Sequence, residues 1–273
     1  MTDVFLKVYR KIIGWKQARE DAENLTRVAS DMRLAVQKAD KIPVLIVCYN
    51  NGSYVANTLR QFASYGLHAI VIDNASSDAA TIEVLTQAEQ AGTAQVVYAR
   101  QNYGNMVGFK PQIYECLPRL FAYTDPDLQY GPEMPPDFMD VLVGLTETYQ
   151  VYKAGFALTL EHRGETASTD NRFTLNIQHP IRFTKSYSVS EWEGPYWLLK
   201  IQHPELDLYS APIDTTFAVY NKDMYRGNYL FPSIRVGGGF SALHLPWFKA
   251  VDVMDDAERQ AYLQNNRSAT WRR

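Results

Sequence analysis

Two aspartates in the middle of the sequence, Asp125 and Asp127, are separated only by Pro126 and follow the apolar residues 120–123. In an extended backbone the side chains of residues i and i+2 point the same way, and a proline biases the residue before it toward that conformation. Two carboxylates held so close repel each other unless a cation or a proton lies between them. A hard divalent cation such as Mn²⁺ or Mg²⁺ prefers oxygen ligands and leaves positions open for a diphosphate. The motif therefore indicates a metal site; the alternative is a turn in which both aspartates cap backbone groups.

Polar residues also follow the other stretches that are typical of buried strands. Apolar runs at residues 44–48, 69–72, 95–98 and 120–123 alternate with segments of helical periodicity. This β-α-β order predicts an α/β fold with a mostly parallel central sheet flanked by helices, in which ligands bind beyond the carboxyl ends of the strands. The polar residues at these ends are Asn50, Asn51, Asp73, Asn74, Asn102, Asp125 and Asp127. Ordinary loop polarity explains any one of them, but it explains four successive strand ends less well.

The sequence pattern divides the chain into three parts. Residues 1–40 predict an N-terminal helical extension, residues 41–160 carry the alternating strands and helices, and residues 161–273 have fewer clear helices and many aromatic residues. Further strands are expected at 155–160 and 217–220. We expect most of the aromatic side chains in the core, because aromatic residues dominate buried area. The candidates for stacking against a sugar ring are Trp192, Trp197 and Trp247.

Composition limits the class of protein. The 273 residues carry a formal net charge of −3 and are 46% hydrophobic, which excludes wholesale disorder and argues against a nucleic-acid partner. No run of about 18 apolar residues predicts a transmembrane helix, and the first residues lack the layout of a signal peptide. The two cysteines, Cys48 and Cys116, build neither a disulfide framework nor a zinc site by themselves, and they suit a reducing compartment. We therefore expect a cytoplasmic protein.

Four segments, taken in order, resemble the nucleotide-binding half of GT-A glycosyltransferases, above all glycosyltransferase family 2 and its bacterial relatives. The segments are residues 42–50 (IPVLIVCYN), 70–78 (IVIDNASSD), 102–104 (NYG) and 125–127 (DPD), and the resemblance covers residues 42–160. It implies the GT-A fold and a metal-dependent transfer of a sugar from a nucleotide-sugar donor, with a UDP-sugar as the expected donor. The implied acceptor is a glycan or glycolipid of a bacterial surface polysaccharide, and the implied cofactor is Mn²⁺ or Mg²⁺.

The resemblance also implies roles for single residues. Asp73 would contact the uracil or the ribose of the donor, and Asn50 and Asn102 would line the same pocket. Asp125 belongs to this nucleotide-binding set as well. Together with Asp127 it would hold the metal ion on the diphosphate.

A histidine near the end of the chain extends the resemblance. His244 begins the sequence His-Leu-Pro-Trp, and several metal-dependent GT-A enzymes use a late histidine as a further ligand. The alternative is a structural histidine packed against Trp247.

An inverting enzyme also needs a carboxylate base near the acceptor. The candidates, in order, are Asp214, Glu193 and Glu191. The Glu-Asp pair that the family usually has before an acceptor-side helix is missing, so the base and the stereochemistry stay open.

Two further questions concern partners and alternative functions. Residues 1–20 form a basic amphipathic stretch, which either lies reversibly on an anionic membrane at its inner face or packs on the core or in a homodimer. A sugar nucleotidyltransferase would need a glycine-rich loop with a basic residue after the first strand, whereas residues 49–53 read YNNGS. The other alternative is a non-catalytic glycan-binding relative, which would not need both Asp125 and Asp127.

Overall fold

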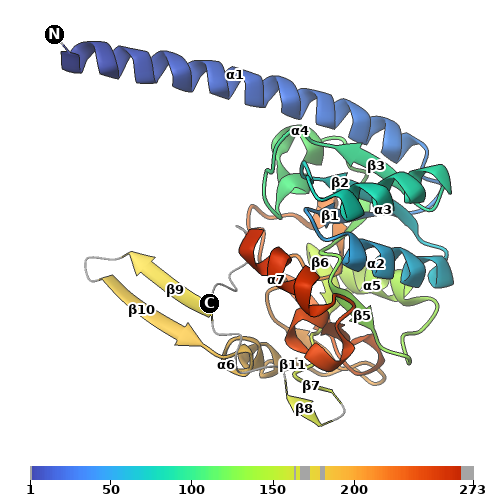
Figure 1. The fold of residues 1–273 in the computed structure, drawn as a ribbon. Coiled ribbons are helices and arrows are strands. Elements are labelled where there is room, and N and C mark those ends of the chain that lie inside the picture. Colours follow the sequence, from blue (N-terminus) through green and yellow to red (C-terminus); the bar gives the residue numbers. More distant parts are fainter. Residues whose placement is uncertain (1, 163, 167–172, 179–181, 266–273) are drawn as a thin grey trace.

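The structure is a computed structural model that describes residues 2–162, 164–166, 173–178 and 182–265 (Figure 1), without the side chains of 2–18, 165, 173–178, 182–187, 263 and 265. The α-helices are α1 (Thr2–Gln37), α2 (Gly52–Tyr65), α3 (Ala79–Gln90), α4 (Pro111–Tyr114), α5 (Phe138–Thr148), α6 (Val189–Glu193) and α7 (Asp256–Asn265). The strands are β1 (Pro43–Cys48), β2 (His68–Asp73), β3 (Gln95–Tyr98), β4 (Leu120–Thr124), β5 (Leu128–Tyr130), β6 (Lys153–Phe156), β7 (Glu161–His162), β8 (Glu165–Thr166), β9 (Phe173–Gln178), β10 (Arg182–Tyr187), β11 (Lys200–Ile201), β12 (Leu208–Ser210), β13 (Ala218–Asn221), β14 (Ser233–Val236) and β15 (Ala242–His244).

Nine of the described strands form one sheet in the order β11-β12-β14-β6-β13-β4-β1-β2-β3. Strand β1 is parallel to β2 and β4, and β3 is parallel to β2. Strand β13 is antiparallel to β4 and β6, β14 is parallel to β6, and β12 is antiparallel to β14 and β11. Following these pairings from β1, seven of the nine strands run in one direction, and only β12 and β13 oppose them. This is the mostly parallel sheet that the sequence predicts.

Strand β1 is buried on both faces of the sheet, which explains why it is apolar without alternation. Val44, Ile46 and Cys48 belong to the core cluster that contains side chains of α2, α3 and α5. Leu45 and Val47 belong to the opposite cluster, which contains side chains of α1 and α4. Helices therefore cover both faces, and the free place for a ligand is the edge where the strands end.

Capping residues fix where the helices next to this edge begin and end. Helix α2 ends at Gly66, whose φ of 58° is left-handed, a conformation that glycine adopts without strain. Helix α3 begins after Asp78, whose carboxylate accepts a hydrogen bond from the backbone N–H of Thr81 at 2.8 Å. The sequence predicts both the stop at Gly66 and the caps before α3.

Residues 161–273 complete the same sheet, because they supply β11 to β14. Strand β13 lies between β4 and β6, so the two larger parts of the chain share one core. The strand expected at 155–160 is shifted in the structure: β6 is Lys153–Phe156. The reason is that Lys153, polar in sequence, is completely buried and begins the strand. Leu158 makes only an isolated bridge to Ala242.

The N-terminal part of α1 projects away from the sheet (Figure 1). Farther along the helix, Val28 and Met32 are completely buried against the core. Among the described residues, no helix has the length and apolar character needed to cross a membrane. The side chains of residues 2–18 lie outside the description, so a contact of residues 1–20 with a membrane or a second copy stays a prediction.

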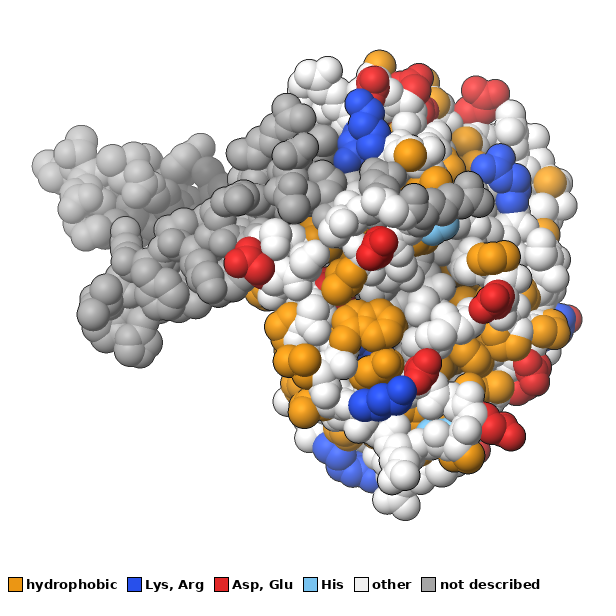
Figure 2. All heavy atoms as spheres, turned by 90° about the horizontal axis from the view of Figure 1, so that it is seen from below, with side chains coloured by type: hydrophobic (Ala, Val, Ile, Leu, Met, Phe, Trp, Pro, Cys, Tyr) orange, Lys and Arg blue, Asp and Glu red, His pale blue; other side chains and the backbone are white. Residues whose placement is uncertain are grey.

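Charged side chains of both signs are scattered over the face shown in Figure 2, with hydrophobic side chains between them. The most exposed large hydrophobic side chains among the described residues are Leu198 and Leu199, at 75% and 66%.

Candidate active site at the carboxyl edge of the sheet

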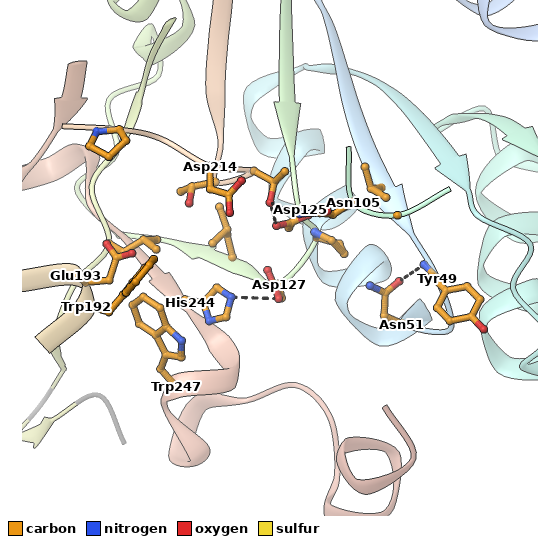
Figure 3. Close-up of a pocket in the computed structure, with 18 of the residues that line it drawn as sticks. Tyr49, Asn51, Asn105, Asp125, Asp127, Trp192, Glu193, Asp214, His244 and Trp247 are labelled. Carbon is orange, nitrogen blue, oxygen red and sulfur yellow. Dashed lines mark hydrogen bonds and ion pairs between the residues drawn. The ribbon is translucent and has the colours of Figure 1, made fainter. Parts of the chain in front are cut away.

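A cavity of about 440 Å³ opens where β1 and β4 end. Residues from both larger parts of the chain line it (Figure 3). The lining residues labelled in Figure 3 are Tyr49, Asn51, Asn105, Asp125, Asp127, Trp192, Glu193, Asp214, His244 and Trp247. The cavity thus joins the Asp-Pro-Asp motif to the residues that the sequence suggests for metal binding and for catalysis.

Asp125 is held in place from the loop before β13. Its backbone N–H donates to the carbonyl oxygen of Thr215 at 2.8 Å, and its Oδ2 accepts a hydrogen bond from the Thr215 hydroxyl. Burial raises the pKa of Asp125 well above its ordinary range, and the charge of Asp127 raises it further. The Asp125 carboxylate is therefore fixed in a place where its negative charge is poorly compensated.

Asp127 lies beside His244 because β5 and β15 pair antiparallel. His244 is opposite Leu128 in this ribbon, and the backbone N–H of Leu245 donates to the carbonyl oxygen of Asp127 at 2.8 Å. The Asp127 Oδ2 is 3.3 Å from His244 Nε2 (Figure 3). The other carboxylate oxygen, Oδ1, is buried without a hydrogen-bond partner among the described residues. The His244 ring also contacts the Trp247 ring, with centroids 4.5 Å apart.

Asp214 lies on the segment 211–217 before β13, which we call the Asp214 loop. Its side chain is exposed to the cavity rather than covered by other side chains. Although the side chain faces the cavity, the protein around it keeps out part of the solvent, and this desolvation raises the pKa of Asp214. The positive charges of Lys153 and Arg235 oppose this rise. A carboxylate with a raised pKa that faces a cavity suits the acceptance of a proton from a bound hydroxyl.

Glu193 also lines the cavity, but it is engaged elsewhere. It is 5% exposed, and its Oε2 lies 2.6 Å from the Arg235 guanidinium in a buried ion pair. Because removing one partner of such a pair leaves an uncompensated buried charge, Glu193 stabilises the structure on this side of the cavity.

The family model that describes glycosyl transferase family 2 matches residues 44–190. This match covers more than half of the chain. The chain belongs to glycosyl transferase family 2. The prediction of this family is therefore confirmed, as is the predicted α/β fold of the GT-A class with its mostly parallel sheet.

The chain is also similar to solved structures. The mannosyltransferase PcManGT from Pyrobaculum calidifontis, in complex with GDP-Man and Mn²⁺, is 13% identical, with a TM-score of 0.44 over 75% of this chain and 57% of that one. A structure of residues 1–349 of S. aureus TarS is 12% identical, with a TM-score of 0.37 over 67% of this chain and 47% of that one. The chain thus spans about half the length of these structures. No curated protein sequence matches it.

The side chains at the cavity fit a divalent metal ion in this family 2 chain. Asp125 and Asp127 supply carboxylate oxygens, and one of these oxygens, Asp127 Oδ1, is buried with no hydrogen bond to another described residue. Among the described residues, no group of three or more His, Cys, Asp or Glu side chains is arranged to hold a metal by itself. Mg²⁺ and similar ions commonly bind through one or two carboxylates together with substrate phosphates, which is what this pair offers.

Four residues that the sequence suggests for the site do not line the cavity: Asn50, Asp73, Glu191 and Trp197. Asn50 Oδ1 accepts hydrogen bonds from the backbone N–H groups of Ser77 and Asp78 at 2.8 and 3.0 Å. Asp73 is 4% exposed at the end of β2, and burial raises its pKa. Glu191 caps α6. Their roles toward donor and acceptor stay predictions.

Amide side chains line one wall of the cavity. The predicted nucleotide contact Asn102 is among them, together with Asn51, Asn74 and Asn105. Asn74 bridges two backbone groups, because its amide donates to the Gly104 carbonyl at 3.0 Å and its oxygen accepts from the Tyr103 N–H at 3.3 Å. A wall of amides and backbone groups can hydrogen-bond a neutral nucleobase or a ribose.

Sequence reasoning missed three residues that organise the site: Thr215, Lys153 and Arg235. Thr215 holds Asp125 from the Asp214 loop. The sequence offered a signal for it, since Asp214-Thr215-Thr216 directly precedes a strand. Lys153 and Arg235 gave no such signal, because both bind backbone carbonyl groups that any residue carries.

Lys153 leads to a prediction about stability and pH. Burial lowers the pKa of Lys153 to about 7, whereas a lysine in an unfolded chain has a pKa of about 10.4. Between these values the unfolded state binds one proton more, so the free energy of unfolding rises with pH by about 1.4 kcal/mol per unit for this group. We expect the wild type to gain stability over Lys153→Met from pH 7.5 to 9.5, measured by urea unfolding. A constant difference between the two proteins across this range would contradict the prediction.

Proposed function

We propose that this family 2 chain is a metal-dependent, inverting glycosyltransferase that moves a sugar from a nucleoside-diphosphate donor to a hydroxyl group of a glycan or glycolipid. The observation that carries this proposal is the convergence of Asp125, Asp127, His244 and Asp214 on one cavity at the carboxyl edge of the sheet. A diphosphate ligand and an acceptor hydroxyl would then lie between the acidic motif and the Asp214 loop.

Asp125, Asp127 and His244 would hold Mn²⁺ or Mg²⁺ on the diphosphate. When bound, such an ion acts as a Lewis acid that stabilises the charge of the departing phosphate. Thr215 fixes Asp125, and pairing of β5 with β15 fixes Asp127 beside His244. The chain itself therefore sets the position of these ligands.

Asp214 is our candidate for the catalytic base. It accepts the proton of the acceptor hydroxyl, and the acceptor oxygen forms a bond to the anomeric carbon of the sugar. The bond between that carbon and the phosphate oxygen breaks, and its electron pair leaves with the nucleoside diphosphate. Glu193 suits this role less well, because its carboxylate forms the buried ion pair with Arg235. Glu191 suits it less well because it caps α6 outside the cavity.

We further propose UDP as the nucleotide, following the resemblance of the residues around Asp73, although PcManGT is shown with GDP-Man. The amide-lined wall is chemically compatible with either base. A lipid-linked or polymeric glycan of a bacterial surface is the proposed acceptor class, and a cytoplasmic enzyme that contacts the inner face of the membrane is the proposed location.

A thermal-shift screen tests the proposal. UDP, GDP, UDP-glucose, UDP-N-acetylglucosamine and GDP-mannose are each added with and without Mn²⁺. A ligand present at 100 times its dissociation constant stabilises the folded state by about 2.7 kcal/mol. We expect at least one nucleotide to raise the melting temperature only when Mn²⁺ is present. We also expect the protein to hydrolyse the corresponding nucleotide sugar slowly, with release of the nucleotide.

The alternatives are distinguished when nucleoside triphosphates, sugar phosphates and oligosaccharides are added to the same screen. A sugar nucleotidyltransferase would be stabilised by a nucleoside triphosphate and would form a nucleotide sugar from a sugar phosphate. A non-catalytic glycan-binding relative would respond to oligosaccharides, with no effect of nucleotide or metal. Either pattern would refute the transferase.

A further inference from the structure

Three successive backbone carbonyl groups of the Asp214 loop accept hydrogen bonds from side chains of β6, β13, β14 and the segment that joins β13 to β14. The carbonyl oxygen of Pro212 accepts a hydrogen bond from Arg235 Nε at 2.8 Å. The carbonyl oxygen of Ile213 accepts one from Lys153 Nζ. The carbonyl oxygen of Asp214 accepts two, from the hydroxyl groups of Tyr229 and Tyr220 at 3.2 and 3.3 Å.

Lys153 is an unusual residue to find under this loop. It is completely buried at the start of β6, and its ammonium group lies 3.9 Å from the centroid of the Tyr229 ring. Burying a lysine carries a large desolvation cost, which hydrogen bonds and an aromatic face offset only in part. The group that receives its hydrogen bond is the backbone directly before Asp214. The lysine therefore acts on the position of this backbone.

Arg235 makes a second attachment from the neighbouring strand. Strands β14 and β6 are parallel, and Arg235 lies opposite Gly155, two residues beyond Lys153, so both cations emerge on one face of the sheet. The Arg235 guanidinium also pairs with Glu193 and lies 4.4 Å from the centroid of the Tyr196 ring. It thus ties the Asp214 loop to the segment of Glu193 and Tyr196, which also lines the cavity.

We propose that Lys153, Arg235 and Tyr229 are positioning residues that fix the backbone of residues 212–214 and thereby aim the Asp214 carboxylate at the acceptor hydroxyl. This inference rests on the proposed function of Asp214 as the base. An aspartate on an irregular loop has no helix or strand to orient it, and a displacement of about 1 Å from reacting atoms can cost about 100-fold in rate. Three anchored carbonyl groups in a row supply the missing rigidity.

The chain provides a closely matched control for a lysine substitution. Lys222 also donates to two backbone carbonyl groups, those of Tyr114 and Leu117 at 3.0 and 2.9 Å, and it lies over the Tyr114 ring at 4.6 Å. It does not line the cavity. Lys222→Met therefore removes the same kind of contact at a place remote from Asp214.

The test measures hydrolysis of the nucleotide sugar that the wild type cleaves fastest in the screen above, with water in place of the acceptor. For Lys153→Met we expect kcat to fall by about 10- to 100-fold, because the base is misplaced. We expect KM for the donor, and stabilisation by UDP with Mn²⁺, to stay within about twofold, because Lys153 is not a donor ligand. Lys222→Met should keep the wild-type kcat. A folded Lys153→Met protein with unchanged kcat would overturn the proposal.

A second comparison separates positioning from general damage. In the Asp214→Asn background, Lys153→Met should cause no further loss of kcat, because the carboxylate that Lys153 positions is already absent. An equal loss in both backgrounds would overturn the proposal. If Lys153→Met fails to fold, Tyr229→Phe replaces it in the test, because this variant removes one hydroxyl group and keeps the ring. A normal kcat in Tyr229→Phe would then count against the proposal. If the wild type neither binds a nucleotide nor hydrolyses a donor, the proposed function itself has failed.

Discussion

Asp125→Asn is expected to abolish the metal-dependent binding of nucleotide and to lower turnover by at least about 100- to 1,000-fold. The Lewis-acid contribution of a bound divalent ion amounts to several kcal/mol, and each 1.36 kcal/mol corresponds to a factor of ten in rate. Asparagine keeps the oxygen that accepts from the Thr215 hydroxyl, so the loop contact survives the change. The measurements are thermal shift with UDP and Mn²⁺ and the rate of donor hydrolysis.

The same substitution has a second expected result, which separates loss of the metal from loss of the fold. Burial and the charge of Asp127 both disfavour the ionised form of Asp125 and raise its pKa. Removing one of two repelling carboxylates should therefore leave the metal-free protein as stable as the wild type, or more stable. Asp137→Asn, an exposed aspartate before α5 with no capping hydrogen bond from its side chain, is the matched control. Nucleotide stabilisation that still depends on Mn²⁺ in Asp125→Asn would refute the metal assignment.

The features that sequence predicts well here are those that repeat along the chain. Strands β1 and β2 are recognisable because burial on both faces makes residues 44–48 and 69–72 apolar, and Gly66 marks the end of α2 because its left-handed φ favours glycine. Asp125 and Asp127 are recognisable because the two-residue period of an extended chain places both carboxylates on one side.

The features that sequence misses depend on contacts between distant residues and the backbone. Lys153 donates to the carbonyl group of Ile213 and Arg235 to that of Pro212, and a carbonyl group gives no sign of its role in the sequence. The same lysine explains why the expected strand at 155–160 lies earlier in the structure, since a buried cation breaks the apolar pattern by which strands are found. Glu193 is a comparable case, because its partner Arg235 is remote in sequence.

Asp214→Asn is expected to lower kcat by about 100- to 10,000-fold, the range that a general base contributes. Asparagine has nearly the same shape but cannot accept the proton of the acceptor hydroxyl. The backbone hydrogen bonds from Tyr220 and Tyr229 to the carbonyl oxygen of residue 214 do not involve the side chain, so the loop should stay in place. Binding of UDP with Mn²⁺ should stay within about twofold of the wild type, because the metal ligands are untouched.

Glu193→Gln is the informative comparison for the identity of the base. This change removes the charge that compensates Arg235 in the buried ion pair, and breaking such a pair costs about 3–5 kcal/mol of stability. We therefore expect Glu193→Gln to unfold at lower urea concentration, whereas Asp214→Asn should unfold at a concentration close to that of the wild type. Near-normal kcat in Asp214→Asn, together with a large loss in a folded Glu193→Gln protein, would transfer the role of base to Glu193. The position of Asp214 at the exposed wall of the cavity, anchored through its own backbone, favours the opposite outcome.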